Sequence, residues 1–105
     1  MTNKERISLS LHDSVVQAKG NLVSDMNGEK VMMSIGSGKY YNLGQIGGRI
    51  WELIEVQISV EQLVSLLVAE YDIEQALCEA QTKSFLEQMI QEGLIEIRDT
   101  AKIIS

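Results

Sequence analysis

Few side chains in this sequence are of the types that perform catalysis, and they do not stand in a catalytic pattern. His12 is the only histidine and Cys78 the only cysteine. General acid or base catalysis needs an oriented partner and a pocket, whereas His12 lies in a polar stretch without a second histidine or a cysteine nearby. Cys78 lies among apolar helical neighbours, where a thiol usually behaves as a small, inert hydrophobe. We therefore predict no catalytic residue and a protein that is not an enzyme.

Residues that could hold a metal or a cofactor are equally sparse. One cysteine and one histidine cannot form the usual four-ligand zinc site, so no metal is expected. Gly44, Gly47 and Gly48 come nearest to a phosphate-binding loop, but no lysine follows them as a nucleotide loop requires. Their spacing is also not that of a dinucleotide-binding turn. Close approach of a helix to a sheet explains these glycines better, and no cofactor is predicted.

The acidic residues are concentrated in the second part of the sequence. The net charge is −6, and residues 44–105 hold four Lys and Arg against eleven Asp and Glu, which gives that part −7. These carboxylates fall on helix surfaces and helix starts, where contact with water and with the helix dipole explains them. Nucleic acid is bound mainly by neutralising phosphates, so the charge argues against nucleic acid and favours a neutral or basic partner.

No stretch of the sequence has the character of a membrane span or a secretory signal. No apolar run approaches the roughly 18 residues of a span. Residues 1–6 are polar and lack the apolar stretch and cleavage pattern of a signal peptide. We therefore expect a cytoplasmic location and no membrane partner.

The first half of the sequence predicts a small antiparallel sheet. Asn27-Gly28 readily adopts the positive backbone angles of a tight hairpin turn, and Gly36-Ser37-Gly38 predicts a second reversal. The strands around these turns are expected at Leu22–Met26, Lys30–Ile35 and Lys39–Leu43. Alternation of Ile7, Leu9 and Leu11 with serines indicates a further short strand or extended arm at the start.

The second half predicts three helices. The first has an apolar face over about three turns, formed by Ile46, Ile50, Trp51, Leu53 and Ile54. The second, about Val60 to Tyr71, begins at a capping box over Ser59–Gln62. The third and longest follows a similar pattern, Asp72-Ile73-Glu74-Gln75, and ends at Gly93, which can adopt a left-handed conformation. A brief strand is expected at Leu94–Ile97. At 105 residues, we expect a single α+β domain.

Two surfaces of this fold are candidates for binding. In the third strand Tyr41 belongs to the core and Tyr40 does not, and the outer edge of a small open sheet can accept an added peptide strand. On the third helix the core stripe is Cys78, Thr82, Phe85, Leu86 and Met89. Beside it runs an uncharged flank of Leu77, Gln81, Ser84 and Gln88, which suits contact with a partner or is a plain solvated flank. Glu79, Lys83 and Glu87 form the opposite flank and are expected to meet water.

The order of elements, Lys39–Leu43, the Gly48–Leu53 helix and the run Phe85–Ile95 together resemble the PqqD-like family over about residues 15–98. The chain is most similar to the stand-alone recognition elements of lasso-peptide pathways. The resemblance implies a winged helix-turn-helix-like domain with an N-terminal arm over 1–14 and a tail over 99–105. It also implies binding of a precursor peptide's leader, which adds antiparallel to the third strand and lies in the groove between that strand and the third helix. The implied peptide-binding residues are Lys39, Tyr40, Tyr41, Asn42, Leu77, Gln81, Ser84 and Gln88.

The resemblance further implies two separate partners, a cysteine protease that removes the leader and a cyclase that closes the ring. Two other functions stay open. One is a winged-helix DNA-binding regulator, although Lys83 is the only basic residue of the third helix between Glu74 and Glu92. The other is a peptide chaperone in quinone-cofactor (PQQ) biosynthesis, which would use the same groove on a different precursor.

Overall fold

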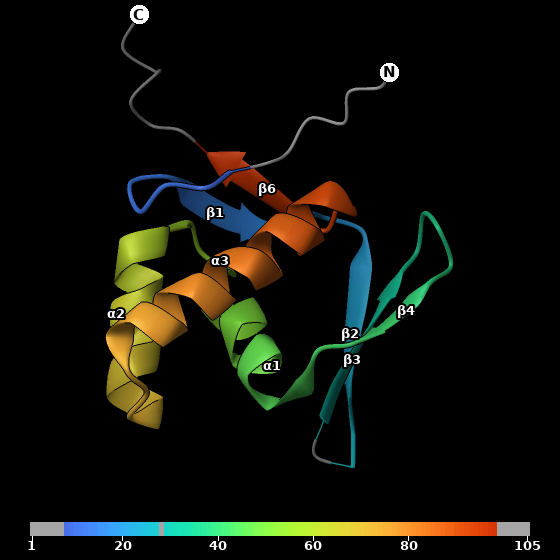
Figure 1. The fold of residues 1–105 in the computed structure, drawn as a ribbon. Coiled ribbons are helices and arrows are strands. Elements are labelled where there is room, and N and C mark those ends of the chain that lie inside the picture. Colours follow the sequence, from blue (N-terminus) through green and yellow to red (C-terminus); the bar gives the residue numbers. More distant parts are fainter. Residues whose placement is uncertain (1–7, 28, 99–105) are drawn as a thin grey trace, which may run out of the picture.

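The computed structural model describes residues 8–27 and 29–98, which form two small sheets and three helices (Figure 1). The elements in chain order are β1 Ser14–Gln17, β2 Asn21–Met26, β3 Glu29–Ser34, β4 Tyr40–Asn42, α1 Gly44–Leu53, β5 Ile58–Ser59, α2 Val60–Tyr71, α3 Gln75–Gln91 and β6 Ile95–Arg98. The prediction of an α+β fold, with a three-stranded antiparallel sheet followed by three helices, is confirmed. The finer likeness to a winged helix-turn-helix domain and the division into arm, core and tail stay predictions.

The meander, which we define as β2, β3 and β4, follows the predicted turns. Its strand order is β2-β3-β4, with both pairs antiparallel. Asn27 has a φ of 56°, as the tight turn requires, and Gly28 lies outside the described residues. Each boundary of these three strands lies within one residue of the expected boundary. Lys39 and Leu43 flank β4 rather than belonging to it, although both still bond to β3.

A second sheet, of order β5-β1-β6, was largely missed by the sequence prediction. β6 was expected within one residue, but β1 and β5 were not expected. Of the short strand or extended arm expected from Ile7, Leu9 and Leu11, the strand is wrong over residues 8–11, which lie in loop and turn, and Ile7 lies outside the described part. Leu9 is nevertheless buried in the core, and its N–H donates to a Glu87 carboxylate oxygen of α3 at 3.0 Å.

The helix ends show which capping signals were correct. Ser59 caps α2, since its side-chain oxygen accepts a bond from the N–H of Gln62 at 3.1 Å. The second capping box is wrong: Asp72 has a φ of 54° and ends α2, while the cap of α3 is Glu74, without a side-chain bond. A capping side chain needs extended backbone at its own position, and Asp72 does not have it. Gly93, with a φ of 80°, ends α3 as predicted.

The core lies among the three helices and the β5-β1-β6 sheet. The meander contributes Met32 to it, and Leu43 follows directly after β4. The predicted inward stripe of α3 is buried except for Phe85, which is half-buried. Ile46, expected on the apolar face of α1, is 37% exposed. The meander therefore projects from a compact helical body, as Figure 1 shows.

Candidate functional site

The outer edge of β4 carries backbone groups that have no strand beside them in the described part of the chain. β4 pairs with β3, and the Leu43 N–H donates to the Lys30 carbonyl at 2.9 Å while the Ser34 N–H donates to the Lys39 carbonyl at 2.9 Å. Alternate residues of an antiparallel strand point their N–H and C=O groups to opposite sides. Because Lys39 and Leu43 point toward β3, Tyr40 and Asn42 point their backbone groups outward.

The two tyrosines of β4 separate as predicted. Tyr40 is 70% exposed, whereas Tyr41 is half-buried against the body. The Tyr41 hydroxyl donates to the Glu92 carboxylate at 2.9 Å, at the end of α3. This hydrogen bond, followed by partial burial, raises the pKa of Tyr41 above its ordinary value. Tyr41 thus joins the edge strand to the helix beside it.

The uncharged flank of α3, with Leu77, Gln81, Ser84 and Gln88, is exposed along its length. The opposite flank differs from its prediction. Glu79, Lys83 and Glu87 are half-buried rather than fully in water, with Lys83 and Glu79 3.4 Å apart and Glu87 holding the N–H of Leu9. The N-terminal segment from residue 8 therefore covers the Glu87 side and leaves the uncharged flank accessible.

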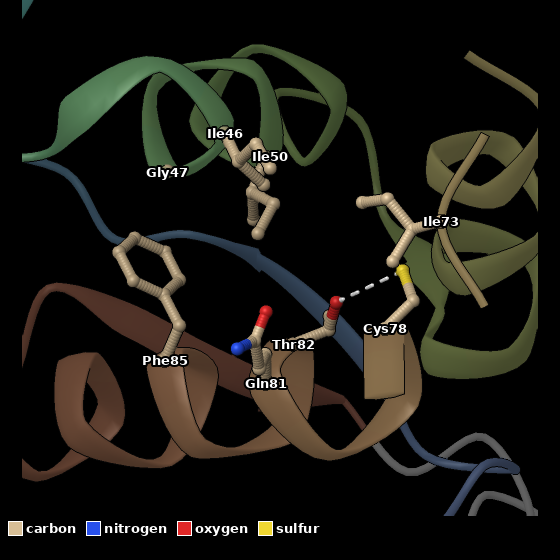
Figure 2. A pocket seen from close by; sticks show the side chains of 8 residues that line it. All are labelled: Ile46, Gly47, Ile50, Ile73, Cys78, Gln81, Thr82 and Phe85. Carbon is tan, nitrogen blue, oxygen red and sulfur yellow. Dashed lines mark hydrogen bonds between the residues drawn. The ribbon is translucent and has the colours of Figure 1, made fainter. Parts of the chain in front are cut away.

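An apolar pocket of about 180 Å³ opens between α1 and α3. Figure 2 shows Ile46 and Ile50 of α1 facing Gln81 and Phe85 of α3 across it. The full lining is Ile46, Gly47, Ile50, Ile73, Cys78, Gln81, Thr82 and Phe85. Of the predicted site residues it includes Gln81, but not the other three on α3 and none on β4. Sequence reasoning missed the pocket, because Ile46 reads as an ordinary core position.

Glycines bring α1 close to both neighbours that frame this site. A Cβ added at Gly47 would lie 3.0 Å from Cε1 of Phe85, and one at Gly48 would lie 2.9 Å from Cγ of Lys30 on β3. The interpretation of these glycines as a close approach of helix and sheet is confirmed for Gly48. Gly47 instead allows α1 to approach Phe85 of α3 closely.

The two residues considered for catalysis or metal binding have different surroundings. His12 is exposed, and Cys78 is a buried free thiol 3.8 Å from the Thr82 hydroxyl. Within residues 8–27 and 29–98, no group of three or more His, Cys, Asp and Glu could hold a metal ion. None of the helices in those ranges has both the length and the apolar character needed to cross a bilayer.

The arrangement is that of a small α+β domain with an open sheet edge beside a helix. The model of the family described as coenzyme PQQ synthesis protein D (PqqD) matches residues 29–95, more than half of the 105 residues, and the chain belongs to this family. A search of curated protein sequences found no significant match.

Two solved structures are similar in fold. The first, TbiB1 in complex with the TbiA(beta) leader peptide, is 26% identical with a TM-score of 0.69, and the match covers 77% of this chain and 94% of that one. The second is the solution structure of the PqqD part of Methylobacterium extorquens PqqCD, described as a functional, stand-alone recognition element for ribosomally synthesised and post-translationally modified peptides. It is 19% identical with a TM-score of 0.72, and the match covers 85% of this chain and 95% of that one.

Proposed function

We propose that this domain is a non-catalytic recognition element that captures the leader segment of a ribosomally made precursor peptide by strand addition at β4. The observation that carries the proposal is the outward direction of the Tyr40 and Asn42 backbone groups at an edge without a neighbouring strand in the described chain. An extended peptide completes such an edge through main-chain hydrogen bonds. The solved complex of TbiB1 with a leader peptide supports this choice of ligand.

The ligand's side chains then meet two parts of the domain. We infer that they contact Lys39, Tyr40, Tyr41 and Asn42 along the edge and the α3 flank of Leu77, Gln81, Ser84 and Gln88. A peptide antiparallel to β4 has its N-terminal side beyond Asn42, where the first turn of α1 carries Ile46. The pocket at Ile46 suits one apolar side chain, because an apolar cavity of roughly 150 Å³ accommodates a benzene ring.

The finer proposal is a role in lasso-peptide biosynthesis, in which the domain presents the leader to a separate cysteine-protease peptidase and to a cyclase in the cytoplasm. The description of the matching family favours a second candidate, a peptide chaperone in the biosynthesis of the quinone cofactor PQQ. Both candidates use the same edge and differ in the precursor. Titration with the leader of each kind of precursor distinguishes them, since the cognate leader should bind at about micromolar Kd or tighter, equivalent to about 8 kcal/mol.

The test of strand addition is a proline that removes one outward N–H. Tyr40→Pro is the suitable variant, because an edge strand tolerates proline where its N–H faces solvent. A proline at Tyr41 would instead break the pairing with Met32. We expect Tyr40→Pro to weaken leader binding at least tenfold, measured by fluorescence polarisation of a labelled leader.

Two controls make this test specific. Tyr40→Ala keeps the backbone donor and separates side-chain contact from strand addition. Asp25→Pro places the same change on β2, the opposite edge of the meander, where the N–H of Asp25 also points outward by the pairing pattern. Asp25→Pro should bind the leader as the wild type does. Unchanged affinity in Tyr40→Pro would exclude addition at β4.

A further inference from the structure

The turn between β4 and α1 decides how the two parts of the proposed site lie relative to each other. The backbone groups of Asn42 belong to the open edge, and Ile46, later in the chain, lines the pocket between α1 and α3. α1 follows β4 after a short turn (Figure 1), where Gly44 has a φ of 74°, a left-handed conformation that favours glycine. Because glycine leaves the backbone freer than other residues do, side-chain bonds must hold this turn if a ligand is to contact both parts at once.

α1 lacks the usual capping side chains at its start. Leu43 at its N-cap is apolar, and residues 44–47 of its first turn include no carboxylate. The first N–H groups of a helix have no acceptor within the helix and need one from outside. Asn42 provides it, because its Oδ1 accepts from the N–H of Gly44 at 3.0 Å. The side chain that caps α1 thus belongs to the edge strand.

The same side chain is also bonded to β3. Nδ2 of Asn42 donates to Oε1 of Glu29 at 2.9 Å. A carboxylate can only accept and an N–H can only donate, so these two partners fix which way the amide of Asn42 points. Asparagine supplies a donor and an acceptor together, which an ionised aspartate or an alanine does not. Asn42 therefore joins β3, β4 and α1 through one side chain, and both the nitrogen and the oxygen of its amide are engaged within the domain.

We propose that Asn42 is a positioning residue of the leader site, whose side chain holds the β4 edge and the first turn of α1 in the arrangement that the leader requires. The inference rests on the proposed function, and it adds a residue that acts through the domain's own hydrogen bonds. A site whose parts are already in place loses less conformational freedom when its ligand binds. Breaking the bonds of Asn42 therefore weakens leader binding even where the leader's own contacts are unchanged.

The experiment exchanges the donor and the acceptor of the bond to β3. Asn42→Ala removes both side-chain bonds, whereas Asn42→Asp keeps an acceptor for Gly44 and sets a second carboxylate against Glu29. The double variant Asn42→Asp/Glu29→Gln restores the bond in the opposite direction and leaves the net charge unchanged. We expect leader affinity to fall about tenfold in Asn42→Ala and about fivefold in Asn42→Asp, and to return within about twofold of the wild type in the double variant.

The probe is the labelled leader, of the lasso or the PQQ kind, that binds the wild type more tightly, followed by fluorescence polarisation. Glu29→Gln alone keeps an acceptor for Asn42 and should bind the leader as the wild type does. Asn21→Ala is the matched control on β2, the opposite edge of the meander, where the Asn21 amide donates to the Ala18 carbonyl at 3.4 Å. It should also bind as the wild type does, and circular dichroism shows whether each variant is folded.

A second measurement follows the N–H of Gly44 by amide exchange in the absence of leader. Exchange should be faster in Asn42→Ala than in the wild type and should slow again in Asn42→Asp/Glu29→Gln, because the cap of α1 is lost in the first and kept in the second. Unchanged exchange in Asn42→Ala would overturn the positioning role.

The outcomes separate this inference from the proposed function. Equally weak leader binding in Asn42→Asp and in the double variant would mean that the amide contacts the leader directly, and it would overturn the inference. Wild-type affinity in a folded Asn42→Ala would overturn it as well. Failure of both leaders to bind the wild type would instead overturn strand addition at β4, while the exchange of Gly44 would still decide whether Asn42 holds the turn.

Discussion

The meander and the helical body, which is α1 to α3 with the β5-β1-β6 sheet, use apolar residues in opposite ways. The body buries them, whereas among the described strands β2 to β4 Met32 is the one fully buried apolar side chain, with Val23 and Tyr41 partly buried against the core. The meander exposes them, since four of the nine large apolar side chains that are exposed in the described residues lie on it or directly after β3. Burial of apolar area is the main source of folding free energy. The body therefore holds the fold together, and the meander presents the edge at which we propose that the leader binds.

A small number of contacts attach the meander to the body. Lys30 of β3 lies 3.0 Å from the Glu52 carboxylate of α1. Met32 inserts into the core, and Tyr41 bonds to Glu92 at the end of α3. These contacts fix the position of β4 relative to α3, which is the geometry that the proposed ligand requires.

The largest difference between the two regions is expected in stability. Leu67→Ala removes a fully buried side chain of α2 and should lower the free energy of unfolding by about 2 to 5 kcal/mol. Leu22→Ala on the meander should change it by no more than about 0.5 kcal/mol. Chemical denaturation followed by circular dichroism measures both. Equal costs would mean that Leu22 is packed as closely as Leu67 in solution, and the two regions would then not differ in how they bury apolar residues.

Gly48→Ala tests the contact between the two regions. The new methyl would lie 2.9 Å from Cγ of Lys30, so either the Lys30 side chain must shift or β3 and α1 must move apart. Overpacking costs about 1 to 3 kcal/mol, and replacing a helical glycine by alanine returns up to about 1 kcal/mol. We expect a net loss of about 1 kcal/mol in denaturation. The control is Gly36→Ala, which has open space around its Cβ and should leave the free energy of unfolding nearly unchanged. If Gly48→Ala were more stable than the wild type, the contact between β3 and α1 would not be tightly packed.

The sequence was sufficient where signals are local. Asn27-Gly28 and Gly36–Gly38 locate the meander, and Ser59 locates the start of α2. The missed elements depend on distant partners: β1 has four residues, and its partners Ser59 and Arg98 come much later in the chain. Strands this short carry too little periodicity to be recognised alone.

The candidate site was also predictable only where its signals are local. Alternation along β4 correctly separated Tyr40 from Tyr41. The pairing register, which alternation does not give, decides that the Tyr40 and Asn42 backbone groups point outward. The pocket at Ile46 depends on how α1 packs against α3, and a helical apolar pattern is the same whether such a position is buried or half open.

A smaller effect is expected from the ion pairs around α1. Bonds from Lys30 and then Arg49 hold the pKa of Glu52 below its ordinary range. A lowered carboxyl pKa contributes stability that is present above the ordinary glutamate pKa and is lost as the pH falls through the lowered one. The unfolding temperature of Glu52→Gln should thus depend less on pH in this acidic range than that of the wild type.

The control for this variant is Glu70→Gln. Glu70 accepts two bonds from Arg49, at 2.8 and 2.9 Å, and so joins α1 to α2 rather than to the meander. Both variants should flatten the pH dependence, because Arg49 also holds the pKa of Glu70 low. Amide NMR shifts should spread into β3 only for Glu52→Gln. Equal disturbance of β3 by both would show that Lys30 does not anchor the meander.

The smallest effect concerns the bond between Tyr41 and Glu92. Because the protonated phenol donates to Glu92, Glu92→Gln should lower the pKa of Tyr41 toward its ordinary value, as followed by NMR of the tyrosine ring. A raised tyrosine pKa contributes stability that is present below the ordinary value and is lost as the pH rises through the raised one, so the variant should lose less stability in alkali. Glu96→Gln, on β6, should leave the titration of Tyr41 unchanged. If Glu92→Gln also leaves it unchanged, the hydroxyl does not hold β4 to α3, and the meander depends on Lys30 and Met32 for its position.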